Sequence, residues 1–232
     1  MLFAYFGLPY FYFRLLRYRQ RRLVRKYRTL LLTYDDGPGD RLTRKVLECL
    51  GRHKVPATFF ILVNNIKERE SLLTALIEQG HQVGLHGYTH QNHWKVLPWV
   101  SVRDIYLGRK AIQKAINTTS VPLYYRPPYG KLNLFSLIYI WICGIRIVPW
   151  TVDCGDTWAH HRRNPDLGSQ ELERYGGIVS LLHDNDRRIP ATEQYVQEVT
   201  EKIILKASEM GLRVCTVEAF DQLIERERSN SI

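Results

Sequence analysis

The sequence predicts an α/β domain built on a parallel sheet that is covered by helices. Short apolar runs alternate with longer amphipathic segments along the chain, which is the order expected of repeated strand–helix units. In addition, polar motifs follow five of the apolar runs, at the carboxyl ends where α/β domains place their chemistry. A (β/α) barrel and an open sheet both fit this pattern.

Each predicted element rests on its own periodicity and on the turn residues that bound it. Seven apolar runs predict strands, at residues 29–34, 57–63, 81–85, 124–126, 145–152, 178–182 and 212–217. Apolar residues spaced three or four apart predict helices at 40–50, 68–79, 101–116 and through Val196–Met210. Gly51, Gly80 and Gly211 stand just past three of these helices, as C-terminal glycines do. Residues 159–175 are expected to form a loop that lines the site.

Composition and charge separate a nearly neutral body from a basic N-terminal segment. The 232 residues are 45% hydrophobic and 24% charged, which excludes a disordered, collagenous or disulfide-stapled chain. Eight of the 33 Lys and Arg residues lie in residues 1–28, which contain no acidic residue. The body therefore keeps 25 basic against 23 acidic side chains. We expect residues 29–232 to form one domain.

Residues 1–28 predict a membrane-associating segment. The first 13 residues are apolar and aromatic and precede the basic run, the reverse of a secretory signal and too short for a spanning helix. Aromatic residues followed by Arg and Lys suit the surface of an anionic bilayer, on the cytoplasmic face. The alternative is a helix packed on the domain with an exposed basic face. Because no base-reading module follows, we expect no nucleic-acid partner.

The first two motifs contain candidate metal ligands. Asp35 and Asp36 are adjacent on a turn, so their side chains point apart and one could hold a metal while the other acts as a base. A solvated turn that caps the next helix is the alternative. His86 and His90 are spaced so that both can reach one ion, and Asp36 would complete a His₂Asp set with open positions. Ordinary surface histidines would show the same spacing.

Three later motifs also close predicted strands. They begin at Arg126, at Asp153 and at the strand that ends in His183. Arg126 precedes two prolines and therefore has no helix to cap. His183 could be a buried structural histidine, but five motifs that each close a strand favour one shared site.

As a set, the five motifs resemble those of the NodB-type polysaccharide deacetylases, carbohydrate esterase family 4. TYDDGP, HGYTH, RPPYG, DCGDTW and LLHD occur in the family's order, and the resemblance covers roughly residues 29–220. It implies a distorted (β/α) barrel in which Asp36, His86 and His90 hold a divalent metal, most often zinc, with cobalt or another divalent ion as alternatives. It further implies that Asp35 is the catalytic base and His183 the catalytic acid.

The resemblance also assigns supporting roles. Arg126 would pair with Asp35 and keep it ionised, and Asp156 would orient His183. The backbone N–H of Tyr129 would bind the oxyanion. The residues implied to line the substrate pocket are Leu181, Trp158 and Pro128.

Three positions depart from the family's motifs, and one of them, Tyr34 in place of Phe, is a mild change. Gly87 replaces a Ser or Thr, so a hydroxyl that would brace the metal loop is missing. Trp158 stands one residue later than usual, which leaves Asp153 as an alternative partner for His183.

The expected function is a metal-dependent hydrolase that removes the N-acetyl group from an N-acetylated amino sugar. The N-terminal segment favours a lipid-linked sugar, or an envelope polysaccharide precursor, at the inner leaflet. Alternatives are an O-acetyl or N-formyl sugar deacylase, an extracytoplasmic peptidoglycan or chitin deacetylase, and a non-enzymatic carbohydrate-binding protein.

Overall fold

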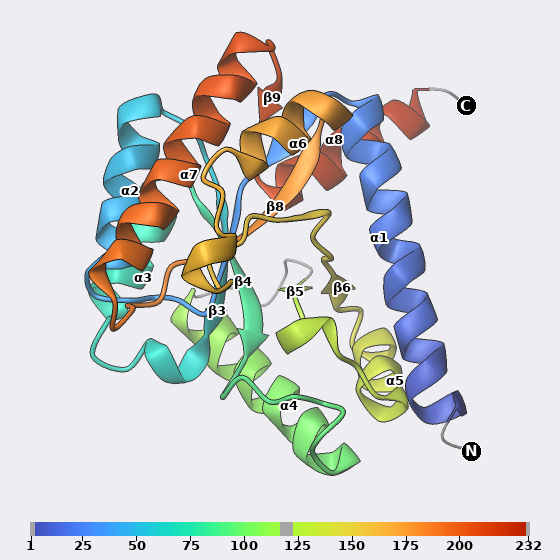
Figure 1. Cartoon of the computed structure of the whole chain (residues 1–232). Helices are drawn as coiled ribbons and strands as arrows, with labels where there is room; N and C mark the ends of the chain where they lie inside the picture. The colour runs from blue at the N-terminus through green and yellow to red at the C-terminus, as the bar shows by residue number, and fades with distance from the viewer. Residues whose placement is uncertain (1–2, 117–122, 231–232) are drawn as a thin grey trace.

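A parallel sheet forms the centre of the computed structural model, which describes residues 3–116 and 123–230 (Figure 1). Every strand pairing is parallel. The strands are β1 (Thr29–Leu31), β2 (Thr33–Asp35), β3 (Thr58–Leu62), β4 (Gln82–Gly87), β5 (Tyr124–Tyr125), β6 (Arg146–Ile147), β7 (Val152–Asp153), β8 (Ile178–His183) and β9 (Arg213–Val214). The predicted α/β class with a parallel sheet is confirmed.

The strand order makes the sheet an incomplete barrel. β2 to β6 pair in chain order, and β8 returns to pair with both β1 and β2. β7 pairs with the other edge of β8, and β9 adds to β1. Among the described residues no ladder joins β6 to β7, so the barrel is open at that point. The carboxyl ends of β2, β4, β5, β7 and β8 consequently gather around one opening.

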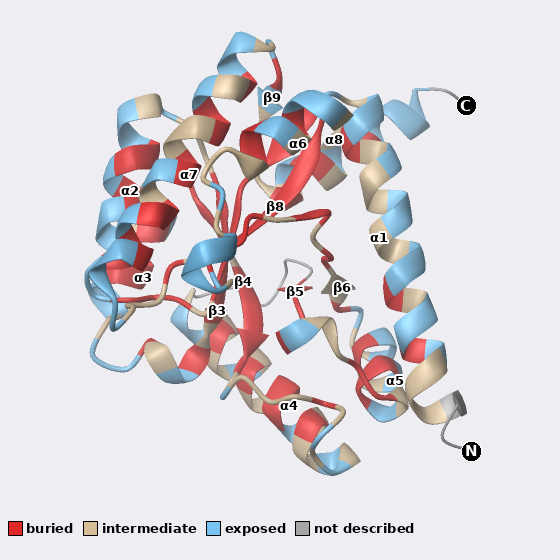
Figure 2. Cartoon of the chain, in the orientation of Figure 1, coloured by how far each residue is buried: buried red, intermediate tan, exposed pale blue. Residues whose placement is uncertain are grey.

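Helices cover the outside of this barrel. They are α1 (Leu8–Lys26), α2 (Leu42–His53), α3 (Glu70–Glu78), α4 (Pro98–Ala115), α5 (Leu134–Ile142), α6 (Leu167–Tyr175), α7 (Pro190–Glu209) and α8 (Val217–Ser229). Figure 2 shows that their buried faces turn toward buried strands, while their outer faces are exposed. Fully buried Leu42, Leu50 and Val199 on α2 and α7 join Tyr34 and Phe59 of the sheet in the larger apolar core.

Several predicted boundaries are wrong for identifiable reasons. The expected strand 29–34 is two strands, β1 and β2, because each pairs with a different neighbour on its outer edge. The expected strand 145–152 is also two, and Pro149, which has no N–H to donate, lies between them. Residues 159–175 are not one loop, since they contain α6. The run 212–217 forms only a two-residue strand because Thr216 caps α8.

The N-terminal segment lies along the outside of the barrel. A short π-helix (Phe3–Gly7) leads into α1, and Met1 and Leu2 lie outside the described residues. Phe13 and Val24 of α1 are buried against the body, and Arg17 and Arg21 each donate a hydrogen bond to the carbonyl of Thr151. In the described part of the chain, no helix has both the length and the apolar character needed to cross a bilayer. Association of this segment with a membrane surface stays a prediction.

Candidate active site

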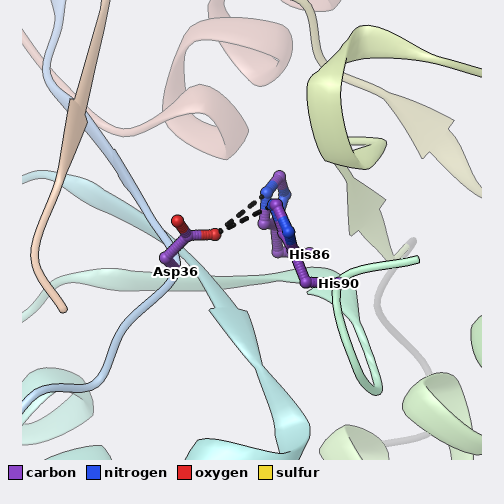
Figure 3. A group of neighbouring side chains, drawn as sticks. All are labelled: Asp36, His86 and His90. Atoms are coloured by element: carbon purple, nitrogen blue, oxygen red, sulfur yellow. Dashed lines mark ion pairs between the residues drawn. The ribbon is translucent and has the colours of Figure 1, made fainter. Parts of the chain in front are cut away.

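Asp36, His86 and His90 converge at the carboxyl ends of β2 and β4 (Figure 3). Asp36 Oδ1 lies 3.4 Å from His86 Nε2 and 3.2 Å from His90 Nε2. Asp36 and His90 both have left-handed backbone, with φ of 69° and 56°, which turns their side chains back toward β4. The three side chains that the sequence suggested as metal ligands therefore do come together.

The donor atoms of this triad fit a divalent cation. Asp36 Oδ1 is buried and accepts no hydrogen bond, an arrangement that is costly unless a cation lies nearby. His86 Nδ1 lies 2.8 Å from the carbonyl oxygen of Arg126, so we assign the proton to Nδ1 and the free lone pair to Nε2. Burial lowers the pKa of His86 to about 3, which keeps the ring neutral, the form that binds metals.

Asp35 lies beside the triad, in a buried ion pair with Arg126. Arg126 Nη1 lies 2.8 Å from Asp35 Oδ1 and also donates to the Thr33 hydroxyl, while its Nε donates to the Val148 carbonyl. Asp35 Oδ2 lies 3.8 Å from His86 Nε2. Burial raises the pKa of Asp35 above its usual value, and the Arg126 charge opposes this rise without cancelling it. The guanidinium acts in the expected direction, but burial has the larger effect, so the carboxylate is more basic than usual.

His183 ends β8 directly opposite Asp35 in the strand register. Its Nδ1 lies 3.1 Å from both carboxylate oxygens of Asp156. Burial by itself lowers the pKa of His183, but the Asp156 carboxylate, with smaller effects from Asp35 and Asp36, raises it to about 9. His183 is therefore protonated at neutral pH, with Nδ1 on Asp156 and Nε2 free to donate.

Asp153, the alternative partner for His183, has a different set of contacts. Its carboxylate accepts hydrogen bonds from the backbone N–H of Gly155 and from the indole N–H of Trp158, at 2.9 and 3.4 Å. The structure thus pairs Asp156, and not Asp153, with His183. Trp158 packs on its own loop, and its place in a substrate pocket stays a prediction.

The remaining predicted residues lie around the same opening. Pro128 and Leu181 are buried, whereas the Tyr129 side chain is exposed. The Tyr129 ring lies 4.6 Å from the His90 ring, between centroids, and its left-handed φ of 58° turns it toward that histidine. The roles of Tyr129 in binding an oxyanion and of Pro128 and Leu181 in lining a pocket stay predictions.

Asp104 braces the loop between the two histidines and was missed in the sequence. Its carboxylate accepts hydrogen bonds from the backbone N–H groups of Tyr88 and Thr89 and from the Thr89 hydroxyl, at 2.8 to 2.9 Å. Gly87 has φ of +120°, and a Cβ there would lie 2.7 Å from Asp104 Oδ2. The brace expected from a hydroxyl at position 87 is therefore supplied by α4. The sequence did contain one signal for this role, because Asp104 is an acidic residue on the apolar face of the predicted helix 101–116.

Comparisons with known proteins agree with this geometry. The sequence model of the polysaccharide deacetylase family matches residues 24–145. The chain is 35% identical over 159 residues to the peptidoglycan-N-acetylglucosamine deacetylase PgdA of Listeria monocytogenes, covering 67% of this chain and 32% of that protein. It thus spans about a third of that relative's length.

Two further likenesses cover most of the matched protein. A chitooligosaccharide deacetylase of Bradyrhizobium is 31% identical over 157 residues, covering 68% of this chain and 71% of that one. The crystal structure of a peptidoglycan N-acetylglucosamine deacetylase superposes with a TM-score of 0.73 at 28% identity, covering 83% of this chain and 87% of that chain. The expected distorted barrel of the NodB type is confirmed by this likeness.

Proposed function

The chain belongs to the polysaccharide deacetylase family, and from this premise we propose that it is a metal-dependent hydrolase that removes the acetyl group from an N-acetylated amino sugar. The observation that carries the proposal is the pair of opposed buried groups beside the metal triad. Asp35 is held by Arg126 on one side, and His183 is held by Asp156 on the other. A basic carboxylate and a protonated imidazole on neighbouring strands are the two partners that amide hydrolysis needs.

The residues of this chain divide the reaction between them. Asp36, His86 and His90 would hold the metal, which supplies Lewis acidity to the acetyl carbonyl and to a water. Asp35 accepts the proton of the attacking water, and Arg126 balances its charge before that transfer. His183 Nε2 donates a proton to the departing sugar amine, while Asp156 stabilises the imidazolium until then.

The substrate that we propose is a lipid-linked amino sugar, or an envelope polysaccharide precursor, at a membrane surface. Support comes from two helices that lie side by side, since the Tyr12 ring of α1 contacts the Trp141 ring of α5 at 5.3 Å. Both helices expose large apolar side chains, which we call the apolar face: Leu8, Phe11 and Leu15 on α1 and Ile138, Trp141 and Ile142 on α5. Exposed apolar groups next to arginines suit the headgroup region of a bilayer.

We place this surface on the cytoplasmic face of the membrane. Basic residues beside a membrane-associating segment favour that side, and α1 carries six arginines between Arg14 and Arg25. The alternative is an extracytoplasmic body acting on peptidoglycan or chitin. Fusion of a reporter that is active on only one side of the membrane distinguishes the two locations.

The function is tested by the acetate released from a set of substrates. We would offer tetra-N-acetylchitotetraose, its N-formyl analogue, an O-acetyl sugar ester and a lipid-linked N-acetylglucosamine, with Asp35→Asn as the matched inactive protein. The proposal expects acetate and a free amine from an N-acetyl substrate and none with Asp35→Asn. Acetate released only from the O-acetyl ester would establish an O-acetyl sugar deacylase. Formate released only from the N-formyl analogue would establish an N-formyl sugar deacylase. If none of the four substrates is hydrolysed with metal present, the protein has a carbohydrate-binding role instead.

A further inference from the structure

A cavity adjoins the candidate active site, between α1 and the loop after β5. Its volume is about 510 Å³. Six of the side chains that line it matter here: Arg14, Arg17, Arg21, Lys131, Tyr129 and Trp150. We call it the α1 cavity. Within the described part of the chain, none of its lining residues is acidic.

The α1 cavity is cationic because of the periodicity of α1. Arg14, Arg17 and Arg21 are spaced three and four apart, so they lie on one face of the helix. This face is the one that closes the cavity. Lys131 joins them from the position directly after the RPPYG motif. Four positively charged side chains thus line the α1 cavity.

These charges are not neutralised within the described residues, where none of the four forms an ion pair. Arg17 and Arg21 donate to the same carbonyl, that of Thr151, and Arg17 Nε is buried without a hydrogen-bond partner. Burial and then Arg21 lower the pKa of Arg17, and Asp153 only partly opposes them. Lys131 Nζ lies 3.7 Å from the centre of the Trp94 ring. An anion in the cavity would relieve this repulsion.

The cavity and the metal triad share a wall. Tyr129 lines the cavity, and its ring also contacts His90. The next residue, Gly130, is so tightly packed that a Cβ there would lie 2.8 Å from Trp150 and 3.2 Å from Phe13 of α1. Helix α1 is therefore packed directly on the active-site loop. A ligand that extends from the triad past Tyr129 enters the α1 cavity.

We propose that the α1 cavity binds the phosphate or diphosphate group of the acetylated sugar substrate. This inference rests on the deacetylase function proposed above and names the chemical class of its substrate, a glycosyl phosphate. Arginine is the side chain best matched to phosphate oxygens, which it binds with two parallel hydrogen bonds. A neutral glycan would leave the four cations without a counter-charge.

The chain offers a matched control on the same helix. Arg19, Arg22 and Arg25 line a different basic cavity, together with Lys26 and Arg228, and no candidate active-site residue lies there. Arg17→Gln/Arg21→Gln and Arg19→Gln/Arg22→Gln each remove two positive charges from α1. The general attraction of the protein to anions should fall equally in the two double variants. A specific binding site in the α1 cavity should be lost only in Arg17→Gln/Arg21→Gln.

The test has a binding arm and a kinetic arm. Calorimetry measures the binding of pyrophosphate and of N-acetylglucosamine 1-phosphate to chelator-treated, metal-free protein, so that the triad does not contribute. Acetate release then gives the ratio of kcat/KM for N-acetylglucosamine 1-phosphate to that for tetra-N-acetylchitotetraose. We expect Arg17→Gln/Arg21→Gln to lower the affinity and the ratio about tenfold or more, the loss typical of a charge-assisted hydrogen bond. The control pair should change neither.

Three results would overturn the inference. Equal losses in the two double variants would show general electrostatics, and no loss in either would show that the cavity is not used. If Arg17→Gln/Arg21→Gln weakens only the binding to phosphatidylglycerol vesicles, with phosphatidylcholine vesicles as the uncharged reference, the cavity holds a lipid headgroup and not the substrate. Pyrophosphate binding that depends on Arg17 and Arg21, without acetate release from any substrate, would support the phosphate site and refute the deacetylase function.

Discussion

His183 Nδ1 lies 3.1 Å from both oxygens of the Asp156 carboxylate, and Asp156 is fully buried. The contact leaves only Nε2 of the ring available to a substrate. It also offsets the effect of burial, so that the pKa of His183 rises to about 9. The pair therefore stores a proton at neutral pH in a site where an isolated imidazole would be neutral.

The pH dependence of the reaction should report this pair. Because the acid must be protonated, activity should fall as the pH rises through the pKa of His183. Asp156→Asn removes the charge that raises the pKa, so the alkaline limb should move down by roughly one to three pH units. Asp153→Asn is the matched control and should leave the limb in place. A pH–rate profile of kcat/KM that is identical in wild type and Asp156→Asn would contradict this role.

The Asp35–Arg126 pair should matter to stability as well as to activity. Arg126→Gln leaves a buried carboxylate without its counter-charge, which typically costs about 3–5 kcal/mol in the free energy of unfolding. The double variant Arg126→Gln/Asp35→Asn removes both charges, so it should recover much of that stability while remaining inactive. Urea unfolding and acetate release measure the two effects. Equal stability of Arg126→Gln and wild type would show that the ion pair is not structural.

Asp104 should control metal affinity without binding the metal itself. Asp104→Ala removes three hydrogen bonds from the loop between His86 and His90, and such outer contacts typically change metal affinity about 10–100-fold. Arg103→Ala, an exposed neighbour on α4, should have no effect. Titration against a competing chelator measures the dissociation constant. A wild-type constant in Asp104→Ala would mean that the loop holds its shape without the brace.

The apolar face should determine binding to membranes. Trp141→Ser/Ile142→Ser removes two exposed side chains from α5, each worth about 1.5–3 kcal/mol if buried in lipid. Leu205→Ser is a control, because Leu205 is 53% exposed on α7, outside the apolar face. Co-sedimentation with vesicles of phosphatidylglycerol and phosphatidylethanolamine measures the bound fraction. If the bound fraction falls only in Leu205→Ser, or falls in neither variant, a membrane role for α1 and α5 is refuted.

The core of the site could be predicted from the sequence because its residues close buried strands. Asp35, His86 and His183 each stand at the end of an apolar run, and parallel strands bring such ends to one side of a sheet. The resemblance pointed to Asp156, but the strand pattern alone does not separate it from Asp153, because Asp153 ends β7 and Asp156 stands only three residues later. Only the turn at Gly155, with φ of +79°, decides which carboxylate reaches β8.

Other features depend on contacts between distant segments. Helix α5 is apolar on nearly every side, so no amphipathic period marks it, and α6 falls in a run of polar residues that resembles a loop. The brace from Asp104 joins α4 to a loop fifteen residues earlier. The α1 cavity likewise requires α1 to pack beside Trp150 and Gly130, which no local pattern in the first 28 residues indicates.

The most direct test of the account is the metal content and acetate release of three purified proteins. These are the wild type, Asp36→Ala, and Asp166→Ala, in which an exposed aspartate that pairs with Lys202 is removed instead. We predict about one divalent ion per chain, with acetate released from an N-acetylated sugar, in the wild type and in Asp166→Ala, and loss of both in Asp36→Ala. Unchanged metal content and acetate release in Asp36→Ala would contradict the assignment of Asp36, His86 and His90 as the metal centre.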